Sequence, residues 1–274
     1  MKEINDIEKS IQKTYKNSIL APFVKAICDY NLVSDGDKIA VCVSGGKDSL
    51  LLSKLFQELK RHNKFSFEVE FMCMDPGFLK DNRVLIESNC QNLNIPIRIF
   101  DSDIFSVIEK TTSEYPCYMC ARMRRGFLYK TAKDLGCNKI ALAHHMDDVI
   151  ETTLMNMFYG SQFMTMVPKL DAENYEGMEL IRPLFYIREK DIIRWQKHNE
   201  ITAIDCGCVV ECHKYSSKRY EVKMLINELE KIDKKIPYSI FHSAENINLE
   251  AVLGYKKAGI KHNYEEIYSS RKKK

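Results

Sequence analysis

The sequence predicts an α/β fold: a parallel sheet with helices on both faces. Three observations lead to this prediction. Short β-branched runs alternate with longer runs that carry apolar residues at helical spacing. A glycine-rich turn joins the first such strand to its helix, and neither an internal repeat nor a long linker divides the chain. The 274 residues are 45% apolar, which is sufficient for a sizeable core.

The first segment, residues 1–17, is polar and carries charges of both signs, so we expect a short surface helix or a mobile segment. Residues 18–32 have the apolar spacing of a helix and end at a polar turn. The alternating elements follow. Strands are expected at 38–43, 67–74, 96–100 and 139–143, and helices at 48–60, 82–93, 121–135 and 147–158.

Residues 160–177 interrupt this alternation with a proline and a polar tract. We expect a hairpin or flap between 163–170 and 178–183, then helices at 188–198 and 215–231. The stretch from about 246 is weakly patterned. The predicted division is an N-terminal segment at 1–17, one main domain at 18–240 and a C-terminal extension at 241–274.

Composition predicts a cytoplasmic protein that does not cross a membrane. No run of about 18 apolar residues exists, and the charged N-terminus lacks the apolar stretch of a signal peptide. Cytosolic thiols are kept reduced, so the ten cysteines do not predict a disulfide framework. Five stand singly among apolar neighbours and are expected to be small buried side chains. These are Cys28, Cys42, Cys73, Cys90 and Cys137.

The run Ser44–Ser49 has the composition of a pyrophosphate-binding loop between a strand and a helix. Gly45 and Gly46 allow a tight turn and a close approach of phosphate to the backbone amides. Ser44 and Ser49 add hydroxyl groups, Lys47 adds a cation, and the helix N-terminus favours an anion. The spacing is neither GxxxxGK(S/T) nor GxGxxG, so those two nucleotide motifs are excluded.

The run 144–148, His-His-Met-Asp-Asp, follows the fourth strand and supports the same site. Ligands of open α/β sheets bind at the carboxyl ends of the strands. Asp147 and Asp148 suit magnesium, which prefers oxygen ligands, although two such residues also serve to cap a helix. Asp75 ends the second strand and is expected at the same edge, where it could contact the nucleotide.

Five further cysteines form two clusters. Cys117 and Cys120 have the spacing with which two thiolates bind one metal centre. Cys206, Cys208 and Cys212 follow much later. The residues alone leave four interpretations open: structural zinc, an iron–sulfur cluster, a redox pair, and a cysteine that carries a persulfide.

The charge distribution adds one candidate RNA-binding surface. A net charge of +3 does not by itself indicate nucleic-acid binding. Arg122, Arg124 and Arg125 follow the first cysteine pair and are candidates for phosphate contacts, with a solvated helix face as the alternative. The terminal run 271–274 is typical of a solvated tail.

The loop Ser44–Ser49 resembles the SGGxDS loop of the PP-loop ATP pyrophosphatase superfamily, whose fold is Rossmann-like, of the adenine nucleotide alpha hydrolase type. The larger set resembles one branch, the tRNA-cytidine 2-sulfurtransferases, over about residues 18–230. The matching runs are 41–49, 75–78, Cys117-x-x-Cys120 with 122–126, 144–148, 181–184 and 188–191.

This resemblance implies ATP-dependent thiolation of tRNA. The C2 oxygen of cytidine 32, in the anticodon loop, would be adenylated and then replaced by sulfur, giving AMP and pyrophosphate. Implied cofactors are ATP, Mg²⁺ and a 4Fe–4S cluster, with sulfide or a cysteine desulfurase as sulfur donor and a homodimer as a compatible assembly. The implied catalytic residues are Lys47, Asp48, Asp147 and Cys206. The implied ATP-binding residues are Ser44, Gly45, Gly46, Lys47, Asp48, Ser49, Asp75, His144 and Asp148.

The cluster ligands implied by the resemblance are Cys117, Cys120 and Cys206. The family usually has a Pro-Cys-x-x-Cys-Gly run where this chain has Asp205–His213 with three cysteines. The third ligand is therefore Cys206 or Cys208, with Cys212 as a fourth ligand or a sulfur relay. Two alternatives stay open: a related enzyme acting on another nucleoside or a small-molecule carbonyl, and a zinc protein.

Overall fold

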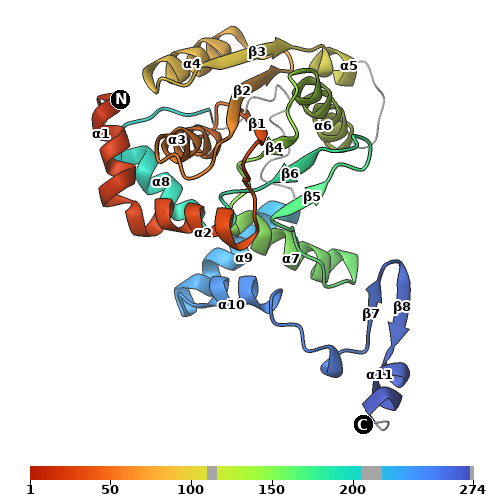
Figure 1. The fold of residues 1–274 in the computed structure, drawn as a ribbon. Coiled ribbons are helices and arrows are strands. Elements are labelled where there is room, and N and C mark those ends of the chain that lie inside the picture. Colours follow the sequence, from red (N-terminus) through yellow and green to blue (C-terminus); the bar gives the residue numbers. More distant parts are fainter. Residues whose placement is uncertain (110–115, 205–217, 272–274) are drawn as a thin grey trace.

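The centre of the molecule is a six-stranded sheet in the order β3-β2-β1-β4-β6-β5 (Figure 1). The computed structural model describes residues 1–109, 116–204 and 218–271. All neighbouring strands pair in parallel except β5, which is antiparallel to β6. The predicted α/β class is confirmed. The strands are β1 Lys38–Cys42, β2 Glu68–Asp75, β3 Ile97–Asp101, β4 Lys139–Ala141, β5 Lys169–Asp171 and β6 Glu179–Ile181.

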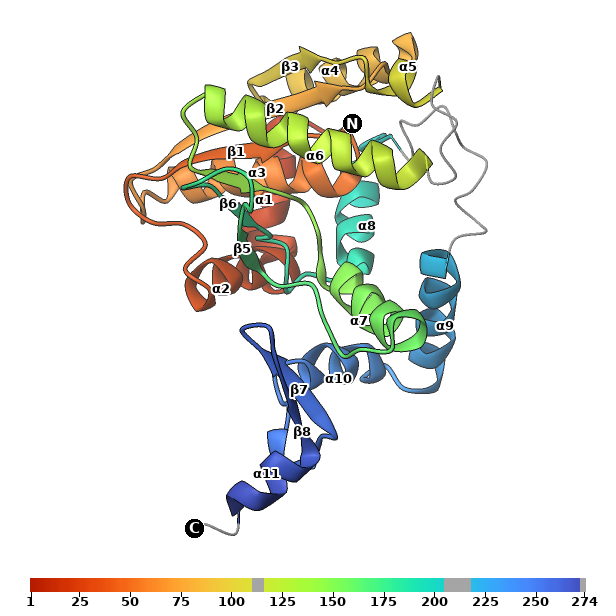
Figure 2. The ribbon, with the colours of Figure 1, turned by 90° about the vertical axis from the view of Figure 1, so that its right-hand side faces the viewer.

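Helices cover both faces of the sheet because buried strand residues alternate between two apolar clusters. Ile39 and Val41 of β1 pack against one set of helices, and Ala40 packs on the opposite side against α6. In Figure 2 the sheet lies between α6 and α3. Helices that contribute to the larger cluster include α2 Ala21–Asp29, α3 Lys47–Arg61, α4 Lys80–Asn92, α7 Met146–Gly160 and α8 Glu189–His198. The opposite face carries α6 Pro116–Asp134, beside the short α5 Ile104–Glu109.

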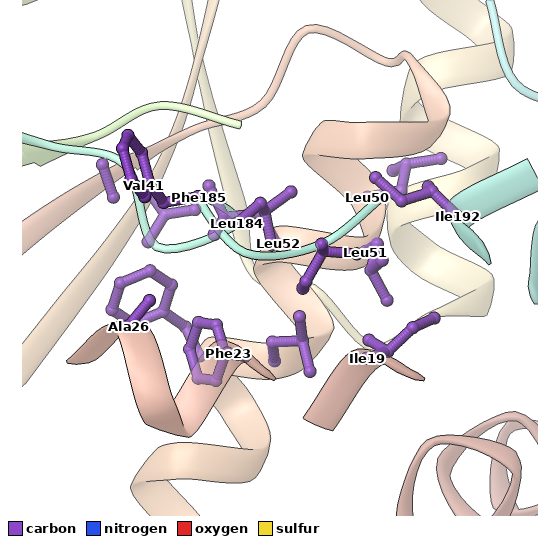
Figure 3. Packing of buried hydrophobic residues seen from close by; sticks show 14 of the residues in the cluster. Ile19, Phe23, Ala26, Val41, Leu50, Leu51, Leu52, Leu184, Phe185 and Ile192 are labelled. Atoms are coloured by element: carbon purple, nitrogen blue, oxygen red, sulfur yellow. The ribbon is translucent and has the colours of Figure 1, made fainter. Parts of the chain in front are cut away.

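The larger cluster is a continuous core. Figure 3 shows side chains of α2, α3 and α8 converging in it, among them Phe23, Leu51 and Ile192. The N-terminal residues also belong to this core. They form α1 Ile4–Lys9 and two π-helical segments, Ser10–Thr14 and Lys16–Leu20.

A short N-terminal helix was expected, and α1 is one. Ile7 and Ile11 are nevertheless fully buried, so this segment is packed rather than mobile. Its three isoleucines at helical spacing contain the signal for that burial, despite the polar residues between them.

The predicted hairpin after residue 160 is confirmed as β5 and β6, although each strand is shorter than expected. Strand β6 also pairs with β4, so the hairpin extends the main sheet. The three residues of β5 are exposed, so packing against the core stabilises only a short strand there.

The C-terminal part contains elements that the sequence pattern did not predict. Helix α9 Lys218–Ile232 is the expected one, and α10 Ile236–Ser243 packs with it against α7. A 3-10 turn at Leu249–Ala251 precedes the hairpin β7 Gly254–Lys257 and β8 Ile260–Asn263, followed by α11 Tyr264–Arg271. Figures 1 and 2 show this last unit standing away from the sheet. The division at 17 and 240 stays a prediction.

The single cysteines follow the expectation in part. Cys73, Cys90 and Cys137 are buried, and burial raises the pKa of the Cys73 thiol to about 12. The prediction for Cys28 is wrong, because this residue lies on the exposed side of α2, where its sulfur is 3.5 Å from Lys64 Nζ. In the described ranges, no helix has the length and apolarity needed to cross a bilayer.

Candidate active site

The candidate site lies where the order of the strands reverses. From β1 the chain builds β2 and β3 on one side, then crosses to β4 on the other side of β1. The loops after β1 and β4 therefore meet at the carboxyl edge of the sheet, the usual ligand position in open α/β folds. The loop after β1 is Ser44–Ser49, and the loop after β4 begins α7.

The loop Ser44–Ser49 is held in shape by its own hydroxyl groups. Ser49 Oγ accepts a hydrogen bond from Ser44 N (3.1 Å) and donates to the Gly46 carbonyl (2.9 Å). Helix α3 has no side-chain cap at Gly46, so its first amides are available to an anion. The loop is therefore shaped before any ligand binds.

Gly45 is required by both conformation and space. Its φ is +81°, where residues with a Cβ are strained, and an added Cβ would lie 2.6 Å from Ile86 Cγ1. The Gly45 carbonyl also accepts a hydrogen bond from Ile204 N at 3.1 Å. Ile204 is the last described residue before the late cysteines, and this hydrogen bond attaches it to the loop.

Two ammonium groups share one carboxylate beside the loop. Lys47 Nζ lies 3.1 Å from Glu189 Oε1, and Lys223 Nζ lies 2.5 Å from Glu189 Oε2. Burial would raise the pKa of Glu189, but Lys223 and Lys47 outweigh it and lower the pKa to about 2. Glu189 therefore stays ionised and keeps both cations at the mouth of the loop.

Asp48 has an oxygen with no partner. Its Oδ2 is 3.2 Å from Lys47 Nζ, whereas its Oδ1 is buried and accepts no hydrogen bond from any described residue. His145 Nε2 lies 3.9 Å from that oxygen, too far for a hydrogen bond. A buried carboxylate oxygen without a donor is the type of ligand that Mg²⁺ takes.

Asp147 and Asp148, predicted as a pair, have different environments. Asp148 forms a capping box with His145: it accepts from His145 N at 3.0 Å and its amide faces Nδ1 at 3.4 Å. Asp147 binds Arg188 Nε with both oxygens, at 3.0 and 3.2 Å, and accepts from Glu189 N at 2.6 Å. Asp147 thus joins α7 to α8, while Asp148 caps the start of α7 and lies 3.6 Å from Arg219 of α9.

His144 lies beside this cap with Nδ1 buried and without a partner among the described residues. Burial lowers its pKa to about 4, against the opposing effect of Asp148 and with the help of Arg182. The imidazole is therefore neutral near pH 7. A neutral ring can donate or accept one hydrogen bond without adding charge.

Asp75 lies at the same edge, at the end of β2, as predicted. Its Oδ1 accepts from the amides of Gly77 and Phe78, and its Oδ2 from Arg83 at 2.9 Å. The carboxylate therefore shapes the turn after β2. A contact with nucleotide stays a prediction.

The cysteine end of α6 is at this edge too. Cys120 is buried in an apolar cluster with Met74, which immediately precedes Asp75, and with Phe105. Cys117 belongs to the first turn of α6, but its side chain lies outside the described residues. The other predicted ligands, Cys206, Cys208 and Cys212, also lie outside them. Within the described ranges, no three His, Cys, Asp or Glu side chains form a metal-binding group.

The three arginines of α6 do not share one environment. Arg122 and Arg125 are exposed three residues apart, on one side of the helix. Arg124 is half-buried, and its Nε has no hydrogen-bond partner among the described residues. The first two are thus accessible to a large anionic ligand.

Comparison with known proteins agrees with these features. The PP-loop domain family matches residues 5–205. A tRNA-cytidine(32) 2-sulfurtransferase of Vibrio campbellii is 35% identical over 90% of this chain and 80% of its own. One from Aliivibrio fischeri is 37% identical over 83% and 71%. The chain belongs to the tRNA-cytidine 2-sulfurtransferase family of PP-loop proteins.

A solved structure supports the family fold. The U34-tRNA thiolase NcsA of Methanococcus maripaludis, determined with its 4Fe-4S cluster, superposes with a TM-score of 0.67 at 21% identity. The match covers 85% of this chain and 80% of that chain. This likeness concerns the fold of the sulfurtransferase.

Sequence reasoning missed several charged residues of the sulfurtransferase site. Arg219 and Lys223 of α9 face it: Arg219 Nη1 lies 2.9 Å from Glu151 and 3.6 Å from Asp148. Their spacing of four places both on one side of a helix, which was the available signal. Arg182, after β6, has a buried Nε without a described partner, and burial lowers its pKa to about 10.

A surface hollow of about 410 Å³ lies elsewhere on the molecule. No residue of the candidate site lines it. We place the chemistry at the carboxyl edge because the charged groups gather there. The hollow is lined by Glu8, Phe56, Gln57, Lys60, Arg61, Val69, Phe71, Asn94 and Pro96.

Proposed function

We propose that this chain is an ATP-dependent sulfurtransferase that converts cytidine 32 of tRNA to 2-thiocytidine. Membership of the family supports the reaction. The observation that carries it is that the loop Ser44–Ser49 and the cysteine end of α6 lie at one edge of the sheet. An enzyme that activates a base with ATP and then inserts sulfur needs both at one place.

In the first step, the C2 oxygen of cytidine attacks the α-phosphorus of ATP. The bond from that phosphorus to the oxygen bridging to the β-phosphorus breaks, and pyrophosphate leaves. The amides of the loop, Lys47 and Lys223 are placed to bind the phosphates and stabilise the charge that develops on them. Mg²⁺ would be held by Asp48, whose buried Oδ1 accepts no hydrogen bond from the described residues. Asp148 would act from the next position, through the capping box with His145, whose Nε2 lies 3.9 Å from that oxygen.

In the second step, a sulfur nucleophile attacks C2. With hydrosulfide as donor, the C2–O bond breaks, AMP leaves with the former cytidine oxygen, and a proton is released, so no oxidant is needed. His144, which its lowered pKa of about 4 keeps neutral near pH 7, is proposed to form a hydrogen bond with the reacting base without adding charge. A desulfurase as donor and a homodimer are parts of the proposal that rest on the resemblance alone, whereas a cytoplasmic location rests on the composition of the chain.

The proposed cluster ligands are Cys117, Cys120 and one late cysteine, Cys206 or Cys208, with Cys212 as a further candidate. The apolar surroundings of Cys120 suit a thiolate–iron site, because they keep water away from it. A 4Fe–4S cluster on three cysteines would supply an open iron to hold sulfur. Arg122 and Arg125 lie on the same helix and are proposed to contact tRNA phosphates.

The test is anaerobic incubation of the holoenzyme with ATP, sulfide and a tRNA transcript that has cytidine at position 32. We expect 2-thiocytidine by mass spectrometry, with one AMP and one pyrophosphate per thiolated base. Cys120→Ser should abolish thiolation, and Cys28→Ser, a change at an exposed cysteine of α2, should not. ATP binding without any thiolated nucleoside in the wild type would refute the proposal.

Absorption spectra and metal analysis separate the alternatives. Iron and acid-labile sulfide in equal amounts, lost in Cys120→Ser, support the cluster. Zinc in a one-to-one ratio with the protein would indicate a structural zinc site instead of the cluster. Thiolation of a different nucleoside would retain the chemistry but change the substrate.

A further inference from the structure

The last unit of the chain is a basic arm. We define the C-terminal arm as residues 254–271, which comprise β7, β8 and α11. Residues 254–274 contain seven Lys or Arg and two Glu, whereas the whole chain has 41 basic and 38 acidic residues. The arm and tail thus carry +5, and the rest of the chain carries −2. The arm itself, residues 254–271, has four Lys or Arg and two Glu, a net charge of +2, and it stands away from the sheet (Figure 1).

Two lysines face each other across the hairpin. Lys256 and Lys261 are directly paired in the antiparallel register. Like charges at opposed positions destabilise a hairpin. Within the described residues, no carboxylate forms an ion pair with either lysine, since Glu266 pairs with His262 at 3.0 Å and Glu265 accepts from Ser269. The repulsion is therefore uncompensated.

The hairpin has little of its own to stabilise it. It has two strands of four residues and one stacked ring pair, Tyr255 with His262. Leu253, just before β7, and Ile260, in β8, are 89% and 63% exposed. Isolated two-stranded hairpins are marginal in water. Local features that oppose stability are typical of functional surfaces, where a ligand compensates for them. A ligand with closely spaced negative charges would relieve the lysine repulsion.

We propose that the C-terminal arm binds the sugar-phosphate backbone of the tRNA, away from the base that reacts. The proposal rests on the proposed function, since it takes tRNA as the substrate. Lys256 and Lys261 project from one face of the hairpin and Lys257 from the other, so the arm offers cations on two sides. Such contacts contribute affinity and orientation without reading sequence.

The test compares Lys256→Ala/Lys261→Ala with the matched control Lys9→Ala/Lys13→Ala in the full chain. Lys9 and Lys13 are an exposed pair at the N-terminal end, without an ion-pair partner in the described residues. Filter binding of a tRNA transcript is measured from low to high salt. We expect the arm variant to bind about tenfold more weakly at about 0.15 M salt, with a salt slope lower by about 1.5–2. The control should bind like the wild type.

Three further measurements test whether the arm variant loses affinity because charge is lost and not because the fold is disturbed. Lys256→Arg/Lys261→Arg should restore binding, because the charge is retained. The KM for tRNA should rise in the alanine variant, while kcat at saturating tRNA stays the same. Its melting temperature should not fall, since the change removes a repulsion.

Three outcomes overturn the proposal about the arm. The arm variant could bind tRNA as tightly as the control while the wild type thiolates, which refutes the arm alone. Its sedimentation coefficient could change, which would make the arm an interface between copies of the chain. The arm variant could lose affinity with an unchanged salt slope, which would exclude phosphate contacts. A wild type that binds tRNA through the arm but forms no 2-thiocytidine refutes the proposed function instead.

Discussion

The nucleotide loop and the C-terminal arm hold their positive charge in opposite ways. Lys47 and Lys223 at the loop are paired with the partly buried carboxylate of Glu189, so two cations are fixed in place before a ligand arrives. Lys256 and Lys261 in the arm are exposed and oppose each other. A small ligand such as pyrophosphate is best met by a fixed and enclosed set of donors, whereas a long polyanion needs an accessible surface.

The largest effect is expected at the buried ion pair that supports the loop region. Arg188 joins Asp147 of α7 to Glu230 of α9 and is itself buried. Arg188→Met removes the buried cation between Asp147 and Glu230, which would keep Glu189 N and Lys190 Nζ as partners. The loss should cost about 3–5 kcal/mol in unfolding free energy. Urea unfolding measures it. Arg194 is on the same helix and pairs with Asp191, but its own side chain is exposed, so Arg194→Met should cost less than about 1 kcal/mol. Equal losses of unfolding free energy in the two variants would show that the buried ion pairs of Arg188 contribute no more to stability than an exposed one.

The next effect concerns the shape of the loop. Gly45→Ala should destabilise the protein by about 2–4 kcal/mol, because the positive φ and the contact with Ile86 add up. ATP binding, followed by calorimetry, should be lost. Gly136 has a φ of +74° but open space around it, so Gly136→Ala should cost only the conformational part, about 1–2 kcal/mol, and keep ATP binding. Unchanged ATP affinity in Gly45→Ala would contradict the loop assignment.

A third test separates the two predicted catalytic aspartates. Asp48→Asn should lower AMP formation about 100-fold with little change in stability, since the negative charge of the carboxylate that would bind the cation is removed. Asp147→Asn should instead lower stability, because it weakens the pair with Arg188. Single-turnover rates and urea unfolding are measured on both. A catalytic role for Asp147 would appear as a slow but fully stable Asp147→Asn enzyme.

The smallest effect is a pH dependence at His144. Burial lowers its pKa to about 4, whereas the unfolded chain takes up that proton below about 6.5. The free energy of unfolding therefore decreases as the pH falls from 6.5 to 4, by up to about 1–3 kcal/mol. Unfolding free energy measured against pH should be flatter over this window in His144→Asn than in the wild type. Parallel curves would mean that His144 is not buried in its neutral form.

The elements whose structure depends on residues close in the sequence could be predicted from the sequence. The first four strands, the turn Ser44–Ser49 and the helix of Asp148 follow from local apolar periods and turn chemistry, and all are present. Long-range pairing was not predictable. Two adjacent aspartates look alike in sequence, and only the position of α8 gives Arg188 to Asp147.

Two further misses have the same origin. Cys28 has apolar neighbours along the chain, but the helix turns its side chain outward. The arm has no apolar period because it has almost no core of its own, so neither propensity nor pattern marked its strands.

The residues on the two sides of the segment 205–217 are held to the rest of the protein by separate contacts. On one side Ile204 donates to the Gly45 carbonyl, and on the other α9 is joined to α8 through Lys223–Glu189 and to α7 and α8 through Arg188 and its two carboxylates. Both ends are thus fastened to the nucleotide loop independently of the peptide between them. A single cut there should leave two fragments that purify together, so a nicked enzyme can keep its ATP site while its late cysteines are divided between the pieces.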